Sequence, residues 1–238
     1  MEATAATESV AEARGRRFDA LTGLAFVVLL LVGLLLPGTP PKADDSIVKI
    51  SSFFHDNRGA ILAGDFIVGV SIVAFFWFLG AVRSYLRAAE GGEGRLSAAA
   101  FGGGIAAAAL LLAGAATVNA ISFKIADAPA PATIRALFDL SNALFAMSGF
   151  PFAVFLGALA CSAARTGALP MWLVWLSTVA AVLQVLAAFA LFASSGAFAA
   201  GGLLATFLFP TVSLVAIACL SVVMYSRGGV PPRLRTAP

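Results

Sequence analysis

The sequence predicts an all-α, polytopic transmembrane helical bundle with six spanning helices and a short outer interfacial helix. Three observations indicate this fold class. Of the 238 residues, 61% are hydrophobic and 11% are charged, whereas about a quarter of the residues in a soluble domain are charged. The apolar residues form six runs, each near the ~20 residues that a helix needs to cross ~30 Å of hydrocarbon. No barrel-like alternation of polar and apolar residues is present, so helices are the spanning form that satisfies the backbone in lipid.

The six runs define the domain organisation. We expect a membrane domain over residues 18–225, between a cytoplasmic N-terminal tail, 1–17, and a cytoplasmic C-terminal tail, 226–238. The predicted spans cover residues 18–36, 60–82, 97–122, 136–160, 171–193 and 203–225. The first run could instead be a signal peptide, because basic residues precede it. The stretch LLLPGTPPKADD has no clear small-x-small cleavage site, which favours a retained helix.

The first loop between spans, 37–59, is predicted to contain the interfacial helix. Its apolar residues recur every three to four positions, at Ile47, Ile50, Phe53 and Phe54. This spacing is typical of an amphipathic helix that lies at the outer membrane surface. Asp56 is expected to cap the start of the second spanning helix.

Basic residues near the ends of the spans predict the orientation. One side of the membrane collects Arg14, Arg16, Arg17, Arg83, Arg87, Arg95, Arg165, Arg227, Arg233 and Arg235, and the other side collects Lys42, Lys49, Arg58, Lys124 and Arg135. The positive-inside rule makes the first side cytoplasmic. We therefore expect a multi-pass protein of the cell membrane with both termini in the cytoplasm.

Charge and cysteine content exclude other classes of protein. The net charge of +3 does not indicate nucleic-acid binding, because the basic residues form short clusters between apolar runs rather than one patch. The lipid bilayer is the expected partner. Cys161 and Cys219 are too few for a disulfide framework, and we expect them to be reduced packing residues.

Small residues and prolines predict how the helices pack. The triple glycine at 102–104, inside the third span, predicts a thin helix that its neighbours approach closely. Pro151 and Pro210 are expected to kink the fourth and sixth spans.

Polar side chains inside the spans mark the candidate site. Asp65 lies about five residues into the second span, where an acid is costly but tolerated near the interface. Further polar residues within the spans are Asn119, Asp139, Asn142 and Gln184. Together they predict a ligand or ion pocket that opens to the outer side, with Arg58 and Arg135 as charge partners. The alternative for Asp65 is an interfacial acid that reaches water or pairs with Arg58.

The fourth span indicates the direction of its polar residues. At 100° per residue, one face carries Arg135, Asp139 and Asn142 together with Ala146, Gly149, Ala153 and Gly157. The opposite face carries Leu137, Leu140, Leu144, Met147 and Phe155. Small residues allow close helix contact and bulky ones suit lipid, so the polar face is predicted to point into the bundle. Arg135 and Asp139 are four residues apart, which leaves a purely local salt bridge as the alternative.

The sequence gives little support for enzymatic chemistry. An intramembrane aspartyl protease needs two carboxylates about 3 Å apart that share a proton. The stretches LAGD at 62–65 and LFDL at 137–140 lack the remaining residues of that signature. His55 is the one histidine in the chain, which leaves too few ligands for a zinc site. We expect no catalytic residue, no metal and no cofactor.

Motifs in the first two-thirds of the chain carry a family resemblance. These motifs are HDNRG, ILAGDFIVG, AFFWFLGAVR and the LR that precedes a short acidic loop. With them the chain resembles an uncharacterised family of small integral membrane proteins from high-GC bacteria. The resemblance implies the topology given above and a bacterial inner membrane, and it brings no known activity.

Two classes of function remain. The first is a non-enzymatic membrane protein, a binding, sensory or accessory subunit whose outer pocket accepts a lipid, a cation or a partner membrane protein. The second is a small proton- or cation-coupled transporter with Asp65 and Asp139 as titrating groups. The cytoplasmic halves of the second, third, fourth and sixth spans carry no charged residue, and no internal repeat or paired broken helices are evident. These features favour the first class.

Overall fold

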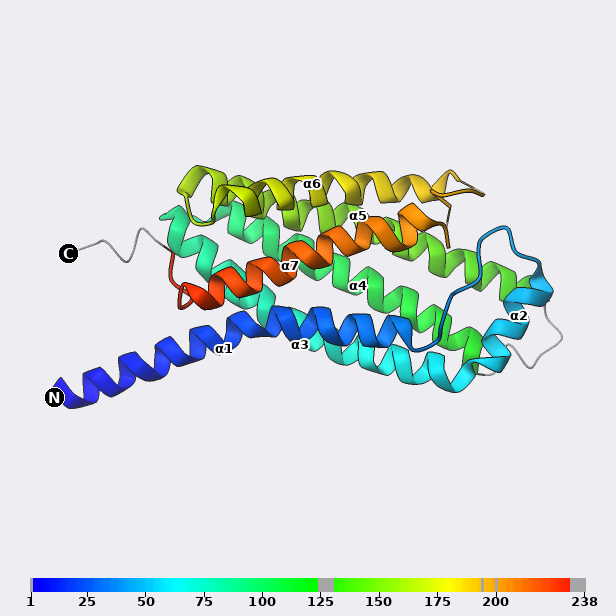
Figure 1. Cartoon of the computed structure of the whole chain (residues 1–238), viewed down its shortest axis with the longest axis horizontal. Coiled ribbons are helices and arrows are strands. Elements are labelled where there is room, and N and C mark those ends of the chain that lie inside the picture. The colour runs from blue at the N-terminus through cyan, green and yellow to red at the C-terminus, as the bar shows by residue number, and fades with distance from the viewer. Residues whose placement is uncertain (1, 124–130, 194, 200, 232–238) are drawn as a thin grey trace.

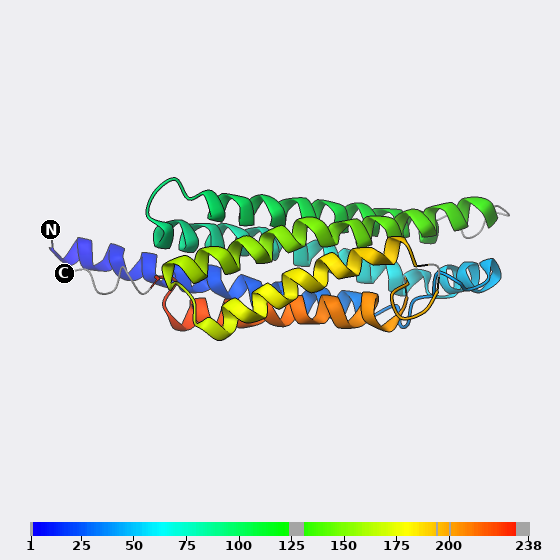
Figure 2. The same ribbon diagram turned by 90° about the horizontal axis from the view of Figure 1, so that it is seen from above.

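The computed structural model describes residues 2–123, 131–193, 195–199 and 201–231. Within these ranges all regular structure is helical, and six long helices run along a common axis (Figures 1 and 2). They are α1 (Glu2–Leu35), α3 (Arg58–Glu90), α4 (Arg95–Phe123), α5 (Pro131–Thr166), α6 (Met171–Ala187) and α7 (Phe209–Ser226). The short α2 (Ile47–Asp56) lies at one end of the bundle. A 3₁₀ turn, η2 (Ala188–Leu191), continues α6, and a π-helical segment, η3 (Leu203–Leu208), leads into α7.

The structure confirms the all-α bundle and its six spanning helices. The stretches that are long and apolar enough to cross a membrane are Phe18–Leu35, Arg58–Glu90, Arg95–Phe123, Pro131–Thr166, Met171–Leu191 and Phe209–Ser226. We call the end of the bundle that carries α2 the α2 end. The opposite end, where α1 enters the bundle and α7 leaves it, is the terminal end (Figure 1).

Three helices are longer than the apolar runs that predicted them. α3, α4 and α5 have 33, 29 and 36 residues, which correspond to lengths of about 50, 44 and 54 Å. The hydrocarbon core is only ~30 Å thick. These three helices are therefore longer than the apolar layer is thick, and turns at one or both of their ends extend beyond it.

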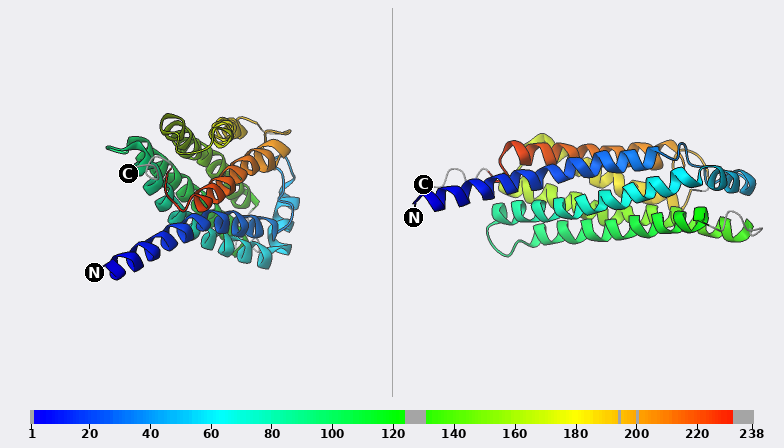
Figure 3. Two further views of the ribbon diagram at one scale, coloured as in Figure 1. Left: turned by 60° about the vertical axis from the view of Figure 1, so that its left-hand side comes forward. Right: turned by 90° about the horizontal axis from the view of Figure 1, so that it is seen from below.

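The predicted N-terminal tail belongs to a helix. α1 begins at Glu2, and its first turns continue away from the bundle at the terminal end (Figure 3). The segment before the first span is therefore a helical extension of that span from residue 2 onward. Of the predicted C-terminal tail, residues 232–238 lie outside the described residues.

The main core lies in the middle of the bundle and towards the terminal end. α3 contributes a stripe of buried side chains spaced three or four residues apart, at Val68, Ile72, Phe75, Leu79, Val82 and Leu86. The ring of Phe75 stacks on Phe26 of α1 and on Phe152 of α5, with centroids 4.4 and 6.1 Å apart. Phe155 packs edge-on against the same ring. Three helices thus meet at one aromatic layer.

Glycines allow the helices to approach closely at defined points. A Cβ added at Gly64 of α3 would lie 2.5 Å from the carbonyl oxygen of Gly33 in α1, so this crossing brings backbone against backbone. In α4, Gly103 faces the backbone of α5 and Gly104 faces the side chain of Leu79, whereas Gly102 faces open space. The predicted role of the triple glycine as a close-packing element is confirmed for two of its three residues.

The two prolines behave differently. Pro151 lies inside α5. Pro210 stands in the first turn of α7, directly after η3, where the missing N–H of proline removes no helical hydrogen bond. The predicted kinks at Pro151 and Pro210 stay predictions, and the irregular backbone of the last span comes before Pro210.

A second, smaller core anchors α2 to the bundle. Ile50 and Phe54 of α2 are buried in one cluster with Ile61, Ile121, Ile134 and Phe138, whereas Val48 is 71% exposed. This confirms the predicted amphipathic helix. The Ser46 hydroxyl accepts a hydrogen bond from the Lys49 N–H and caps α2. Asp56 is the last residue of α2 and does not cap α3, because Asn57 occupies that position.

Candidate functional site

Two contact layers set the axial register between α3 and α5. In the middle of the bundle, the rings of Phe75 and Phe152 stack. Nearer the α2 end, Ile61 and Phe138 belong to one buried cluster. Both helices run from the α2 end to the terminal end (Figure 1). Residues at matching distances from these contacts therefore lie at the same level.

Asp65 and Asn142 occupy matching positions between the two layers. Asp65 lies four residues after Ile61, and Asn142 lies four residues after Phe138, the second of two α5 residues in this cluster. Each lies ten residues before the stacked phenylalanine of its own helix. Asp65 lies on the same side of α3 as the stripe of buried residues. It comes one turn after Ile61 and three residues before Val68, and both of these residues are buried. The carboxylate is thus on the face of α3 that packs against the bundle.

Each of these two side chains has a buried polar atom without a partner. The Asp65 Oδ2 and the Asn142 Nδ2 are covered and form no hydrogen bond with any described protein group, so they do not bond to each other. One atom is an acceptor and the other is a donor. A buried polar group left unsatisfied costs about 1–3 kcal/mol. A bound group that offers hydrogen bonds or positive charge at this level would therefore be stabilised.

Asn119 lies near the same level on α4, about half a turn from Ile121. It lies two residues before Ile121, a member of the outer cluster, on a helix that runs towards the α2 end. The side chain is half-buried. We call Asp65, Asn119 and Asn142 the polar layer. The oxygen atoms of one carboxylate and two carboxamides can bind an alkali-metal ion or an ammonium group. These oxygens and the amide N–H groups can also form hydrogen bonds with a polar side chain of another helix.

The depth of the polar layer follows from the helix lengths. Asp65 lies seven residues after Arg58, the first residue of α3, or about 10 Å along the helix axis. α3 exceeds the hydrocarbon thickness by ~20 Å. If this excess is shared between the two ends, the polar layer lies at the boundary of the apolar region on the α2 side.

Arg58 does not pair with Asp65. Its guanidinium donates a hydrogen bond to the backbone carbonyl of Phe123 and lies 5.7 Å from the centroid of the Phe123 ring. Arg58 thus connects the start of α3 with the end of α4. Arg58 lies about 10 Å along the helix axis from Asp65, towards the α2 end, and its guanidinium is directed at Phe123 rather than at the carboxylate.

Asp139 and Arg135 form a separate ion pair near the start of α5. The Arg135 Nε donates to the Asp139 Oδ2 at 3.0 Å, and the Asp139 side chain is 52% exposed. Arg135 also donates to the carbonyl of Ala43 at 2.7 Å, which fastens α5 to the α1–α2 loop. The local salt bridge is confirmed. The prediction that this face of α5 points inward is wrong for Asp139.

The helical-wheel prediction for α5 is correct only in part. Gly149 is buried as predicted, but Phe155, assigned to the lipid-facing side, is fully buried. The reason is that α5 packs against α4 on one side and α6 on another. Two separate faces of the helix are therefore covered, and a single inward face does not describe it.

Gln184 belongs to another part of the bundle. Its Nε2 donates to the Ser213 Oγ of α7 at 2.8 Å. Its backbone carbonyl lies against Gly149 of α5, where an added Cβ would come within 2.6 Å. Gly149 is seven residues closer to the terminal end than Asn142. Gln184 thus joins α5, α6 and α7 and is not a member of the polar layer.

The structure also contains a polar cluster at the terminal end that was not predicted. Glu90, the last residue of α3, accepts hydrogen bonds from the N–H groups of Leu96 and Ser97 and from the Ser162 hydroxyl, at 3.2, 2.9 and 2.8 Å. It therefore caps α4 and links it to α5. The signal in the sequence is an acid followed by a glycine-rich turn and a serine at the start of the next span.

The polar layer offers carboxylate and carboxamide groups that can donate or accept hydrogen bonds. In the part of the chain that the structure describes, no group of three or more His, Cys, Asp or Glu side chains could hold a metal ion. Comparison with protein-family models, curated proteins and solved structures finds no match for this chain. The resemblance to a family of bacterial membrane proteins therefore stays a prediction, and function has to be inferred from the polar layer itself.

Proposed function

We propose that this chain is a non-enzymatic membrane protein that binds a cationic or hydrogen-bonding group at the polar layer, entered from the α2 end. The group belongs to an ion, a lipid or a helix of a partner membrane protein, for which the chain acts as a binding, sensory or accessory subunit. One observation carries the proposal. The Asp65 carboxylate lies on the packed face of α3 with a buried oxygen that no described protein group satisfies.

The aromatic layer argues against passage beyond the polar layer. On its terminal side, the rings of Phe26, Phe75, Phe152 and Phe155 pack against one another from three helices. An ion crossing this region would lose its hydration without replacement, at a cost of several kcal/mol or more. The Asp65 carboxylate lies near the α2 end, and packed aromatic rings fill the bundle beyond it. This arrangement suits a binding site.

The orientation is part of the proposal. Arg83, Arg87, Arg95, Arg165 and Arg227 lie near the terminal end, and fewer basic residues lie near the α2 end. The positive-inside rule then places the terminal end in the cytoplasm and the polar layer towards the outside. The groups that the polar layer offers to a ligand are the same in either orientation. The orientation decides whether the ligand comes from outside the cell or from the cytoplasm.

Cysteine labelling tests the orientation. We expect a single cysteine at Val48→Cys in α2 to react with a membrane-impermeant maleimide in intact cells, and one at Glu93→Cys, in the α3–α4 turn, to react only after permeabilisation. Both positions are exposed, and the natural Cys161 and Cys219 are first replaced by serine and alanine. Labelling of Glu93→Cys from outside would invert the orientation.

A second experiment tests binding at the polar layer. The thermal unfolding midpoint of the purified protein is measured in detergent with Na⁺, K⁺ and ethylammonium at constant ionic strength. At least one of these cations is expected to raise the midpoint of the wild type, because a ligand that binds only the folded state stabilises it. Asp65→Asn should abolish this rise. Asp139→Asn, which removes an exposed and already paired carboxylate, should retain it.

The same variants distinguish binding from transport. In liposomes with an imposed proton or sodium gradient, the wild type is expected to give the ion flux of empty vesicles. A flux well above that background, lost in Asp65→Asn, would make the protein a cation-coupled transporter. Equal responses of wild type and Asp65→Asn to all three cations, with no co-purified lipid or protein lost in the variant, would overturn the assignment of the site.

A further inference from the structure

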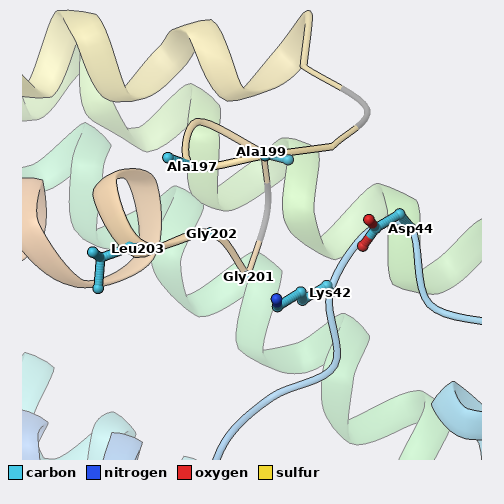
Figure 4. Close-up of a pocket in the computed structure, with 8 residues that line it drawn as sticks. Lys42, Asp44, Ala197, Ala199, Gly201, Gly202 and Leu203 are labelled. Atoms are coloured by element: carbon cyan, nitrogen blue, oxygen red, sulfur yellow. The ribbon is translucent and has the colours of Figure 1, made fainter.

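A cavity of about 240 Å³ opens at the α2 end, away from the polar layer. It lies between the α1–α2 loop, which supplies Lys42 and Asp44, and the connection from η2 to η3, which supplies Ala197, Gly201, Gly202 and Leu203 (Figure 4). The two walls are in contact. A Cβ added at Gly201 would lie 2.8 Å from the Lys42 Cα, and Gly201 has a φ of +79°. Glycine is thus required where the walls meet.

The cavity contains one positive and one negative side chain. Lys42 and Asp44 both leave the α1–α2 loop on the side that faces the η2–η3 connection (Figure 4). Neither side chain forms an ion pair with another described residue. The cavity is therefore neutral overall but has two separate charges available to a ligand.

The neighbouring charges, Asp45 of the same loop and Lys49 of α2, already pair with each other. The Lys49 ammonium donates to the Asp45 Oδ1 at 2.7 Å, and the Lys42 backbone N–H donates to the Asp45 Oδ2 at 2.8 Å. The hydrogen bond from Lys49, followed by that from the Lys42 backbone, holds the pKa of Asp45 below its ordinary value. Asp45 and Lys49 thus stabilise the loop, whereas Lys42 and Asp44 remain directed at the cavity.

The depth of the cavity matches the headgroup region of a membrane. The span Met171–Leu191 has 21 residues, or about 31 Å, which is close to the thickness of the hydrocarbon core. The segment that follows Leu191 and lines the cavity therefore begins where the hydrocarbon ends. Leu203, which lines the cavity, is 70% exposed, and Phe192 at the start of the segment is 86% exposed, which suits contact with acyl chains.

We propose that this cavity binds a zwitterionic lipid headgroup of the ethanolamine class, with its phosphate at Lys42 and its primary ammonium at Asp44. Charge-assisted hydrogen bonds of this kind are stronger than neutral ones. The volume of the cavity equals that of about eight water molecules at ~30 Å³ each, which is sufficient for such a headgroup. The site uses none of the residues of the polar layer, so it does not depend on the proposed function.

Native mass spectrometry of the detergent-solubilised protein tests the proposal. Phosphatidylethanolamine and phosphatidylcholine with identical acyl chains are added at equal concentrations. We expect phosphatidylethanolamine to bind about tenfold more tightly, because its ammonium can donate hydrogen bonds to Asp44 and a quaternary ammonium cannot. Lys42→Ala and Asp44→Ala should each remove most of this preference.

Two further variants separate the cavity from general effects of charge and folding. Ala197→Leu leaves both charges in place but adds volume from an exposed wall of the cavity, and it should also abolish the preference. Lys49→Ala removes a cation from the adjacent α2, outside the cavity, and should preserve it. Asp65→Asn should preserve it as well, which distinguishes failure of this site from failure of the polar layer.

The source of the zwitterion is tested with free O-phosphoethanolamine. Displacement of the lipid only at concentrations far above that of the lipid supports a headgroup site with acyl-chain contacts. Tight binding of the free molecule, lost in Lys42→Ala, supports the same zwitterion site with a soluble ligand. Equal binding of the two lipids, or binding unchanged in both Lys42→Ala and Ala197→Leu, would overturn the proposal.

Discussion

Gly64→Ala is expected to destabilise the protein by about 1–3 kcal/mol, the usual cost of inserting an extra methyl group into a well-packed contact. The added Cβ would lie 2.5 Å from the carbonyl oxygen of Gly33. This neighbour is backbone, so it cannot move aside as a flexible side chain would. α1 and α3 would have to separate at their crossing. Unfolding of the purified protein in a series of SDS–detergent mixtures measures the change in free energy.

Gly69→Ala is the matched control on the same helix. No atom lies within 4 Å of a Cβ added at Gly69, so the change should be neutral or stabilising by up to about 1 kcal/mol through helix propensity. Gly33→Ala should resemble Gly64→Ala. The double variant should cost less than the sum of the two, because both substitutions force the same helix separation. Equal stability of Gly64→Ala and Gly69→Ala would show that the crossing is not tightly packed.

The spans were predictable from the sequence because hydrocarbon thickness limits the length of an apolar run. Their ends were less predictable. The second span was expected over residues 60–82, but α3 extends over Arg58–Glu90. Backbone hydrogen bonds continue through polar residues beyond the membrane, whereas hydropathy marks only the part within lipid. Glu90 was missed as a capping residue for the same reason, since it lies outside the apolar run.

The candidate site was only partly predictable, because depth and direction have different origins. Depth follows from counting along a helix, which predicts one level for Asp65 and Asn142 because each is four residues from a residue of the second core and ten residues from a stacked phenylalanine. Whether a side chain points into the bundle depends on how many helices pack around its own helix. A helical wheel carries no information on these neighbours. The pairing of Gln184 with Ser213 and the cavity between two distant loops likewise depend on tertiary packing.

Asp65→Ala is expected to raise the free energy of unfolding by about 1–3 kcal/mol, the cost of an unsatisfied buried polar group. Alanine adds no volume, so the result does not depend on how well the site tolerates a larger side chain. Asp65→Leu should change stability in the same direction if the space allows it. Asp139→Ala, which breaks an exposed ion pair, should change stability by less than about 1 kcal/mol. The measurement is again SDS unfolding, without added ligand.

The sign of this effect distinguishes a structural acid from a binding acid. A carboxylate that fastens helices together destabilises the protein when it is removed, because its partners are left unsatisfied. If the carboxylate instead serves to bind a ligand, its removal stabilises the ligand-free protein and abolishes binding. Such a trade-off is common where activity requires a strained or unsatisfied site. We therefore expect Asp65→Ala to be more stable than the wild type without cations, and the difference to shrink when the stabilising cation is added. Destabilisation of Asp65→Ala under both conditions would assign Asp65 to the structure of the bundle instead.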